Sequence, residues 1–400
     1  SNMASELNGV AEALRREQAV ATFLDWCSDA GCEWGSIRLD YGDKGWGLFA
    51  AKDISCFREV LVVPLSAGIA DEGGKDWHIR MAETLAVSRV DQRRAPWMSL
   101  LPWSFSSVCS WSPNDVAALG CQRAKRKADF LRSARRDDVE ALAAHGIDES
   151  AGGVALDIVF SRTVSCGSDR DVGDGREPGK RALLPLFDMA NHARTPTAEY
   201  RCVEDSERIV VRACTDISKG EEITISYGQK SIEVFMFFYG FLPPEGESVF
   251  EFEVRWSDVA RDNLIDESVL RKWVTAAGAD VEKPLVIEIF ESGVLVPNQP
   301  SVGLLRAVLA TQSELEDLSS IDVVSSQVSP DNEGRVVSAL HSAASRCCGD
   351  LDMDGDTDLH GVLPFAFRKR LAATLHRCAW FFSDHLAEPE IAGSALDGVQ

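Results

Sequence analysis

The sequence lacks any apolar run of the roughly 18 to 20 residues that a helix needs to span a bilayer. It also lacks the apolar stretch of a secretory signal near its start. We therefore expect no membrane association and an intracellular protein, cytoplasmic or nuclear. The opening Ser1-Asn2-Met3 resembles a remnant of cloning, so import into an organelle by a removed targeting segment is left open.

Positive charge is also scarce, because 41 Lys and Arg stand against 63 Asp and Glu, for a formal net charge of −22. Binding to nucleic acid draws its affinity from clustered Lys and Arg, so this balance argues against a nucleic-acid partner. A basic protein segment fits an acidic surface better. One basic cluster does occur, and the acidic residues that follow it predict a solvated charged helix face. It consists of Arg123, Lys125, Arg126 and Lys127.

Paired cysteine motifs are missing as well. The eleven cysteines are scattered without a CxxC unit, and their number is odd. This pattern indicates neither structural zinc nor a disulfide framework. We expect reduced thiols, most of them packed in the core as small apolar side chains.

An acidic stretch at residues 350–358 needs separate treatment. Its oxygen-bearing side chains at alternate positions match the first nine positions of a calcium-binding helix-loop-helix, but the twelfth position is Gly361 where a bidentate Glu belongs. We expect a solvated turn and no metal site, with calcium binding as the alternative.

Length and apolar content predict two domains, because 400 residues with 45% hydrophobic side chains can fill two cores. The apolar spacing predicts a helix at 6–30 and then short strands, including one at 223–227, around helical segments at about 66–164. Beyond one strand at 250–254 the chain is expected to be helical. The predicted fold class is therefore α+β, with a β-rich domain at 1–245 and a mainly α-helical domain at 246–400.

The rest of the chain is organised around residues 183–241. An apolar run from Leu183 stops at a polar corner that contains Asp188, Asn191 and His192, and a later strand ends at Tyr227. Many donors and acceptors just outside an apolar wall predict a small-molecule pocket. The preceding segment, 165–180, is rich in Gly, Asp and Arg and predicts a mobile surface loop.

Four motifs occur in a particular order. They are Gly45-Trp46-Gly47-Leu48, Ser161-Arg162, Asp188-Met189-Ala190-Asn191-His192, and Tyr227-Gly228 with Tyr239-Gly240-Phe241. In this order they resemble a SET-domain protein methyltransferase. The resemblance is greatest to the Rubisco large-subunit methyltransferase-like class, in which a SET core with a helical insert precedes a helical substrate-binding domain.

The resemblance implies S-adenosylmethionine as cofactor and a protein lysine as substrate. The implied cofactor-binding residues lie at the glycine turn and the polar corner: Lys44, Gly45, Trp46, Gly47, Arg162, Asp188, Asn191, His192 and Tyr227. Tyr227 is the implied catalytic residue, and the implied substrate-binding residues are the aromatic ones, Phe187, Phe238, Tyr239 and Phe241. An apolar channel would favour the neutral lysine amine, because burial disfavours the ammonium ion.

Two positions bear on activity and target. The family usually has Asn where this chain has Ile232, which changes the packing expected there. Thr163 lies where members that methylate histidine would carry an amide, and Tyr239 resembles lysine-directed members. We therefore expect a monomeric lysine N-methyltransferase of a non-histone protein. The alternatives are a histidine N-methyltransferase, a catalytically weak SET-like binding scaffold and a calcium-responsive interaction protein.

Overall fold

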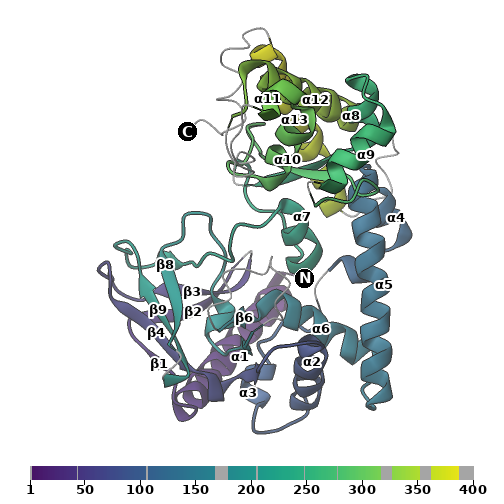
Figure 1. Cartoon of the computed structure of the whole chain (residues 1–400). Helices are drawn as coiled ribbons and strands as arrows, with labels where there is room; N and C mark the ends of the chain where they lie inside the picture. The colour runs from purple at the N-terminus through teal and green to yellow at the C-terminus, as the bar shows by residue number, and fades with distance from the viewer. Residues whose placement is uncertain are drawn as a thin grey trace. The chain divides into compact units, whose positions relative to one another are not determined.

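The computed structural model describes residues 2–42, 44–104, 107–166, 179–203, 206–246, 248–276, 278–316, 327–351 and 362–386. The chain forms two compact units, residues 1–105 with 133–229 and residues 106–132 with 230–400. The first unit contains three small sheets, and the second is mainly helical (Figure 1). The α+β fold class is therefore confirmed. The domain boundary expected near residue 245 stays a prediction.

Short antiparallel sheets build the first unit. Their strands are brief because turns with Gly, Asp and Ser interrupt each apolar run. In β4, for example, Val60, Leu61 and Val63 are buried while Glu59 is exposed. The sheets run in the orders β1-β4-β9-β8, β10-β3-β2 and β5-β7-β6. The bounds are β1 Glu33–Trp34, β2 Ile37–Gly42, β3 Gly45–Ala50, β4 Glu59–Pro64, β5 Ile69–Asp71, β6 Val164–Ser165, β7 Arg181–Leu183, β8 Ala198–Val203, β9 Arg208–Ala213 and β10 Glu222–Ile223.

The strand predicted at 223–227 is shorter than expected. β10 ends at Ile223, and beyond it Ile225 forms only an isolated bridge with His192. The chain leaves the sheet here because Ile225 pairs with the polar corner instead: its N–H donates to Asn191 O at 2.9 Å. Tyr227 is thus directed by the corner and not by a strand.

Helices complete the first unit. Asp148 caps α6 by accepting from the Ala151 N–H at 3.0 Å, and α6 ends at Arg162, a predicted site residue. α2 and α6 pack against each other, as Figure 1 shows. The bounds are α1 Asn2–Asp29, α2 Trp77–Ser88, α3 Ala95–Met98 and α6 Glu149–Arg162, with a 3₁₀ turn η3 at Phe187–Met189. α5, Gln122–Ala144, contributes residues to both units.

Two turns share the sequence Asp-Ile-Ser, at residues 53–55 and 216–218, and hydrogen bonds join them in both directions. Ile54 and Ile217 exchange backbone hydrogen bonds of 2.9 and 2.8 Å. The carboxylate of Asp53 accepts from the N–H of Lys219, and that of Asp216 accepts from the N–H of Cys56, each at 2.8 Å. This arrangement fixes the turn before β10, and with it the position of β10 beside β3.

The second unit packs helices on a two-stranded sheet. β11, Val249–Val254, pairs antiparallel with β12, Leu285–Phe290, which the sequence prediction missed among the helices. The helical region expected beyond residue 254 is also interrupted at Ala310-Thr311, which separates two helices. The helices are α4 Pro113–Ala117, α7 Ile232–Val234, α8 Trp256–Asp262, α9 Glu267–Ala276, α10 Pro300–Leu309, α11 Gln312–Glu316, α12 Pro330–Gly349 and α13 Val362–Leu386, and a π-helix, η5, covers Phe235–Tyr239.

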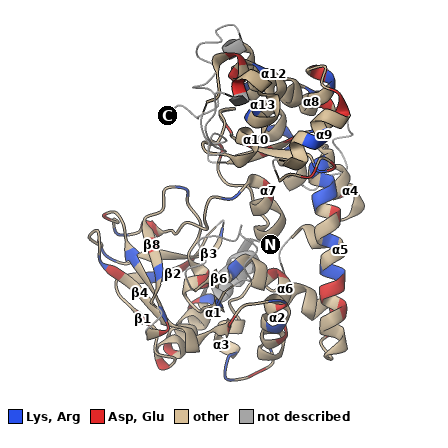
Figure 2. Ribbon diagram, viewed as in Figure 1, with Lys and Arg blue, Asp and Glu red and all other residues tan. Residues whose placement is uncertain are grey.

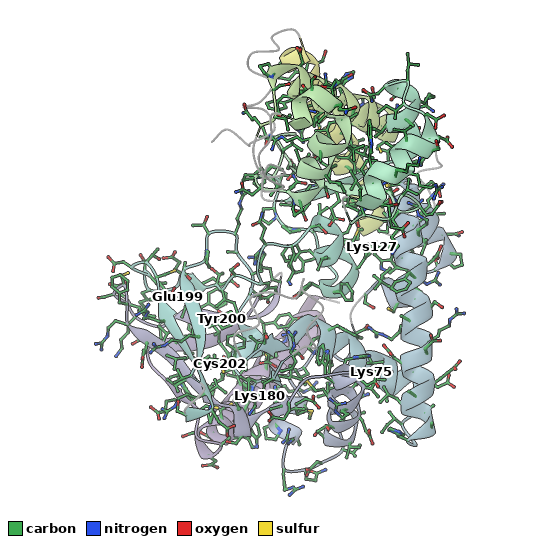
Figure 3. The ribbon with its side chains drawn as sticks, viewed as in Figure 1. Lys75, Lys127, Lys180, Glu199, Tyr200 and Cys202 are labelled. Atoms are coloured by element: carbon green, nitrogen blue, oxygen red, sulfur yellow. The ribbon has the colours of Figure 1, made fainter. Side chains whose placement is uncertain are left out.

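The basic cluster at the start of α5 is not the solvated face that the sequence predicted. The side chain of Arg123 is 13% exposed and pairs with Glu233 and Glu251, and Lys127 Nζ lies 3.1 Å from Glu233 Oε2. Figure 2 shows the charges along α5, and Figure 3 labels Lys127. Their acidic partners lie more than 100 residues away in the sequence, so the local charge pattern could not reveal them.

All eleven cysteines lie in described residues and are free thiols. Cys27, Cys32, Cys166 and Cys378 are buried, and five others pack partly buried against the two cores. Within the described ranges no helix is long and apolar enough to cross a membrane. Residues 167–178 of the loop predicted at 165–180 and residues 352–358 of the acidic stretch lie outside these ranges.

The close approach of Gly68 to β7 gives the first prediction. A Cβ at Gly68 would lie 2.2 Å from Leu183 O and 2.7 Å from Leu184 Cδ2, where no side chain fits. Because the clash is with backbone, Gly68→Ala should lower the free energy of unfolding by about 1–3 kcal/mol, as overpacking does. Urea denaturation followed by circular dichroism measures this change.

The matched control is Gly153→Ala in α6, where the nearest atom to an added Cβ is 3.9 Å away. This change should leave stability unchanged or raise it by up to about 1 kcal/mol, since alanine favours helix. Equal stabilities of the two variants would contradict the packing argument.

Candidate functional site

The end of the β2–β3 hairpin forms one side of the candidate site. Its residues Gly45 to Gly47, the first three of β3, are called the glycine turn below. Gly45 has a φ of +85°, a left-handed conformation that favours glycine. Gly47 allows a close approach: a Cβ there would lie 3.0 Å from Glu222 Oε1 and 3.1 Å from Asn191 Nδ2, so those side chains would have to shift. The turn therefore brings its backbone against two polar side chains from distant parts of the sequence.

Asn191 joins this turn to the polar corner. Its Nδ2 donates to Trp46 O at 3.2 Å and to Glu222 Oε1 at 2.8 Å. The backbone carbonyl of Asn191 accepts from the N–H of Ile225, and this bond anchors the corner to the segment after β10. One side chain thus connects the glycine turn, the corner and β10.

Tyr227 is fixed against the corner by three interactions. Its hydroxyl donates to Ala190 O at 2.8 Å, and its backbone N–H donates to His192 Nδ1 at 3.2 Å. The rings of His192 and Tyr227 lie 5.2 Å apart between centroids, at an angle of 34°. Because Nδ1 accepts a hydrogen bond, the neutral imidazole carries its proton on Nε2.

The environment of Tyr227 keeps its phenol neutral. Burial, and to a smaller extent the carboxylates of Asp188 and Glu222, raises the pKa of Tyr227 to about 12, while Arg162 opposes this rise. A phenol with such a pKa stays protonated at physiological pH. It can orient a substrate by hydrogen bonding, but it cannot serve as a base there.

Asp188 supports the corner from inside the core. Its Oδ2 accepts from Trp97 Nε1 at 3.0 Å, and its backbone carbonyl accepts from Arg162 Nη1. Burial raises the pKa of Asp188 to about 6, and Arg162 and the Trp97 N–H offset only part of that rise. The side chain therefore contacts α3, and Arg162 reaches the corner through a backbone oxygen.

Sequence analysis missed Glu222 and Trp97. Glu222 alternates with buried Ile223 as any exposed strand residue would, so nothing in the pattern marked it. In the structure it accepts from Asn191 and from Lys44 Nζ, the latter at 3.3 Å. Trp97 lies in the region of helical segments predicted at about 66–164, and its partnership with Asp188 spans 91 residues, so no local pattern indicated it.

The predicted aromatic residues fall into two groups. Phe187 belongs to the first unit, where it is buried and its ring lies 5.0 Å from that of Tyr200. Phe238, Tyr239 and Phe241 belong to the second unit. There the rings of Tyr239 and Phe241 lie 5.6 and 5.5 Å from Phe235 and 6.3 Å from each other. The predicted aromatic residues thus belong to two different units.

The two positions that bear on activity and target are both buried or nearly so. Ile232 is fully buried in the apolar core of the second unit, beside Ser231. Thr163 follows directly after α6 as its C-cap, and its buried Oγ1 has no hydrogen-bond partner among the described residues. The roles that the resemblance implies for Ile232 and Thr163 stay predictions. In the described part of the chain, no group of three or more His, Cys, Asp or Glu could hold a metal ion.

Comparison with known proteins identifies a domain that covers this site. Residues 45–228 match the SET domain family. Actin-histidine N-methyltransferase from Xenopus tropicalis is 24% identical over 258 residues, which are 57% of this chain and 44% of that protein. The chain therefore spans less than half the length of this curated relative.

Solved structures extend the similarity to both units. A SET domain of LSMT bound to lysine and AdoHcy has a TM-score of 0.63 at 19% identity and covers 94% of this chain and 93% of its own. Rubisco LSMT bound to AdoMet has a TM-score of 0.64 at 19% identity, with 93% of each chain covered. SET-domain proteins use S-adenosylmethionine as their cofactor. The chain thus contains a SET domain at residues 45–228, and its fold is similar to that of Rubisco LSMT over nearly its full length.

Proposed function

We propose that this chain, a protein methyltransferase by its SET domain, transfers a methyl group from S-adenosylmethionine to a lysine of a non-histone protein. The observation that carries the proposal is the fixed position of the Tyr227 hydroxyl. It lies 2.8 Å from Ala190 O, directly before Asn191 and His192, and its ring packs on His192. A neutral phenol is thereby held beside the residues proposed to bind the cofactor.

The residues at the corner fit the proposed cofactor. Asn191 and His192 offer hydrogen-bonding groups, the turn at Gly45 and Gly47 brings backbone close to them, and Trp46 adds apolar surface. Such a mixture suits a ligand with an aromatic base, a sugar and an amino-acid end. When bound, the sulfonium of S-adenosylmethionine supplies an electrophilic methyl group. Lys44, Arg162 and Asp188 are the remaining proposed members of this site.

Tyr227 would position the nucleophile. Its hydroxyl donates to Ala190 O, and a phenol that donates its proton can present its oxygen to an amine N–H. A lysine amine, with a reference pKa of about 10.4, is neutral in on the order of one molecule in a thousand at pH 7. Alignment of the amine and exclusion of water are therefore the main tasks of the protein. Phe187, Phe238, Tyr239 and Phe241 are proposed to contact the substrate side chain.

The C-terminal helices are proposed to dock the protein substrate. The net charge of −22 supports a basic segment as the docked element. Histidine is the second candidate target, because the curated relative is an actin-histidine N-methyltransferase. Tyr239, which resembles the residue of lysine-directed members, supports lysine.

Replacement of Tyr227 tests the proposed role. Tyr227→Phe keeps the ring on His192 but removes the hydroxyl, so methyl transfer should fall about 10²-fold or more, as for loss of one transition-state contact. Affinity for the cofactor should change by less than about tenfold. Transfer is measured with radiolabelled S-adenosylmethionine and a cell extract, and affinity by calorimetry.

Tyr200→Phe, on β8 in the same unit (Figure 3), is the matched control and should stay active. Tight cofactor binding without any labelled product in the wild type would favour the scaffold.

The target amino acid is tested on the same labelled product. Acid hydrolysis of the labelled protein followed by amino-acid analysis should recover the label as methyl-lysine. Recovery as methylhistidine would instead establish the second candidate. Mass spectrometry of the labelled band then identifies the substrate protein and the modified position.

The ionisation of Asp188 predicts a pH dependence of stability. Its folded pKa of about 6 lies above the unfolded value of 3.8, so the native state binds more protons between these values. Stability should therefore fall as pH rises from about 4 to 6, by about 3 kcal/mol in total. Asp188→Asn removes this term, so the variant should gain stability relative to the wild type over that interval. Urea titrations at pH 4 and 7.5 measure the difference, and parallel pH profiles would contradict the buried-carboxyl account.

A further inference from the structure

We infer that Lys44 and Glu222 together bind the amino-acid end of the cofactor, with Glu222 accepting its ammonium group and Lys44 facing its carboxylate. The inference rests on the proposed function, because it assigns two side chains to the proposed cofactor site. Lys44 was expected there from the resemblance alone, and Glu222 was not expected.

Glu222 occupies a fixed place in the site. It lies on β10, where it pairs with Phe49 of β3. Just before it, Gly220 N–H donates to Ala50 O and Glu221 O accepts from Ala50 N–H. From there its carboxylate reaches Asn191 Nδ2 at 2.8 Å and comes within 3.0 Å of the Cβ position of Gly47. Glu222 therefore faces the glycine turn and the corner together.

The carboxylate still has capacity for a ligand. Within the described residues it accepts one hydrogen bond from Asn191 and one from Lys44, whereas two carboxylate oxygens offer about four acceptor sites. Its side chain is 22% exposed, so a ligand can reach it, while the desolvation around it strengthens a charge-assisted contact. An ammonium group, which has three donors, matches this remaining capacity.

Lys44 supplies the opposite charge next to it. Its Nζ lies 3.3 Å from Glu222 Oε2, and its side chain is 60% exposed. An exposed ion pair of this kind adds little to stability, so each partner can be drawn to a ligand at small cost. A zwitterionic α-amino acid carries both charges on adjacent groups, and the pair presents the complementary charges at that spacing.

Two ligands separate this inference from general binding at the site. S-adenosylhomocysteine has the amino-acid end, whereas 5′-deoxy-5′-methylthioadenosine has the same nucleoside and thioether without it. Calorimetry with the full chain gives a dissociation constant for each. Glu222→Gln keeps an oxygen for Asn191 but removes the charge, so it should weaken S-adenosylhomocysteine binding by about ten- to a hundredfold. Binding of methylthioadenosine should change by less than about twofold.

Two further variants complete the test. Lys44→Met, at a position 60% exposed where the ion pair adds little to stability, should weaken S-adenosylhomocysteine binding by about two- to tenfold and leave methylthioadenosine binding unchanged. The control is Glu221→Gln, since Glu221 is exposed and its side chain only accepts from Ser218 N–H in the turn. It should bind both ligands like the wild type.

The outcomes are distinct. Loss of affinity for S-adenosylhomocysteine alone supports the inference. Unchanged affinity in both Glu222→Gln and Lys44→Met, or an equal loss for both ligands, overturns it while the proposed function stands. A wild-type protein that binds neither ligand overturns the proposed function, and this inference with it.

Discussion

The amide of Asn191 is the contact on which the first unit depends for its polar site. It bonds Trp46 on the glycine turn and Glu222 on β10, which lie 145 and 31 residues away in the sequence. A buried or half-buried amide is stable only when its partners are in place. The hairpin, the corner and β10 must therefore assemble together, and a Cβ at Gly47 would crowd the side chains of Glu222 and Asn191 where they meet.

The groups around the Asn191 amide differ in burial and in charged neighbours. Tyr227 is kept as a neutral hydrogen-bonding group, because burial and nearby carboxylates raise its pKa. Asp188, whose carboxyl is buried against Trp97, supports the chain below the corner. Lys44 Nζ and Glu222 Oε2 lie 3.3 Å apart at the more exposed edge, within reach of a ligand. The site thus grades from a buried side at Asp188 to an exposed side that carries the Lys44–Glu222 ion pair. Such a gradient suits a ligand with an apolar centre and a charged end.

Local sequence predicted some parts of this arrangement and failed at others. The turn with Gly45 and Gly47 was predicted because its residues are neighbours in the chain. The strand at 223–227 was overestimated because its apolar alternation continues although Ile225 pairs with the corner. The prediction of an exposed helix face at Arg123 was wrong because the acidic partners of Arg123 come from α7 and β11. Each failure involves a partner that the local pattern does not contain.

The sequence by itself determined the α+β class, the short strands with their turns, and the ordered motifs that led to Tyr227 and Asn191. These are properties of neighbouring residues, since periodicity and turn chemistry act over a few positions. Only the tertiary structure decided that Asp188 faces Trp97, that His192 accepts from Tyr227, and that Glu222 stands between Lys44 and Asn191. These pairings are long-range because hydrogen bonds and ion pairs require distances of about 3 Å, which only folding of distant segments can bring about.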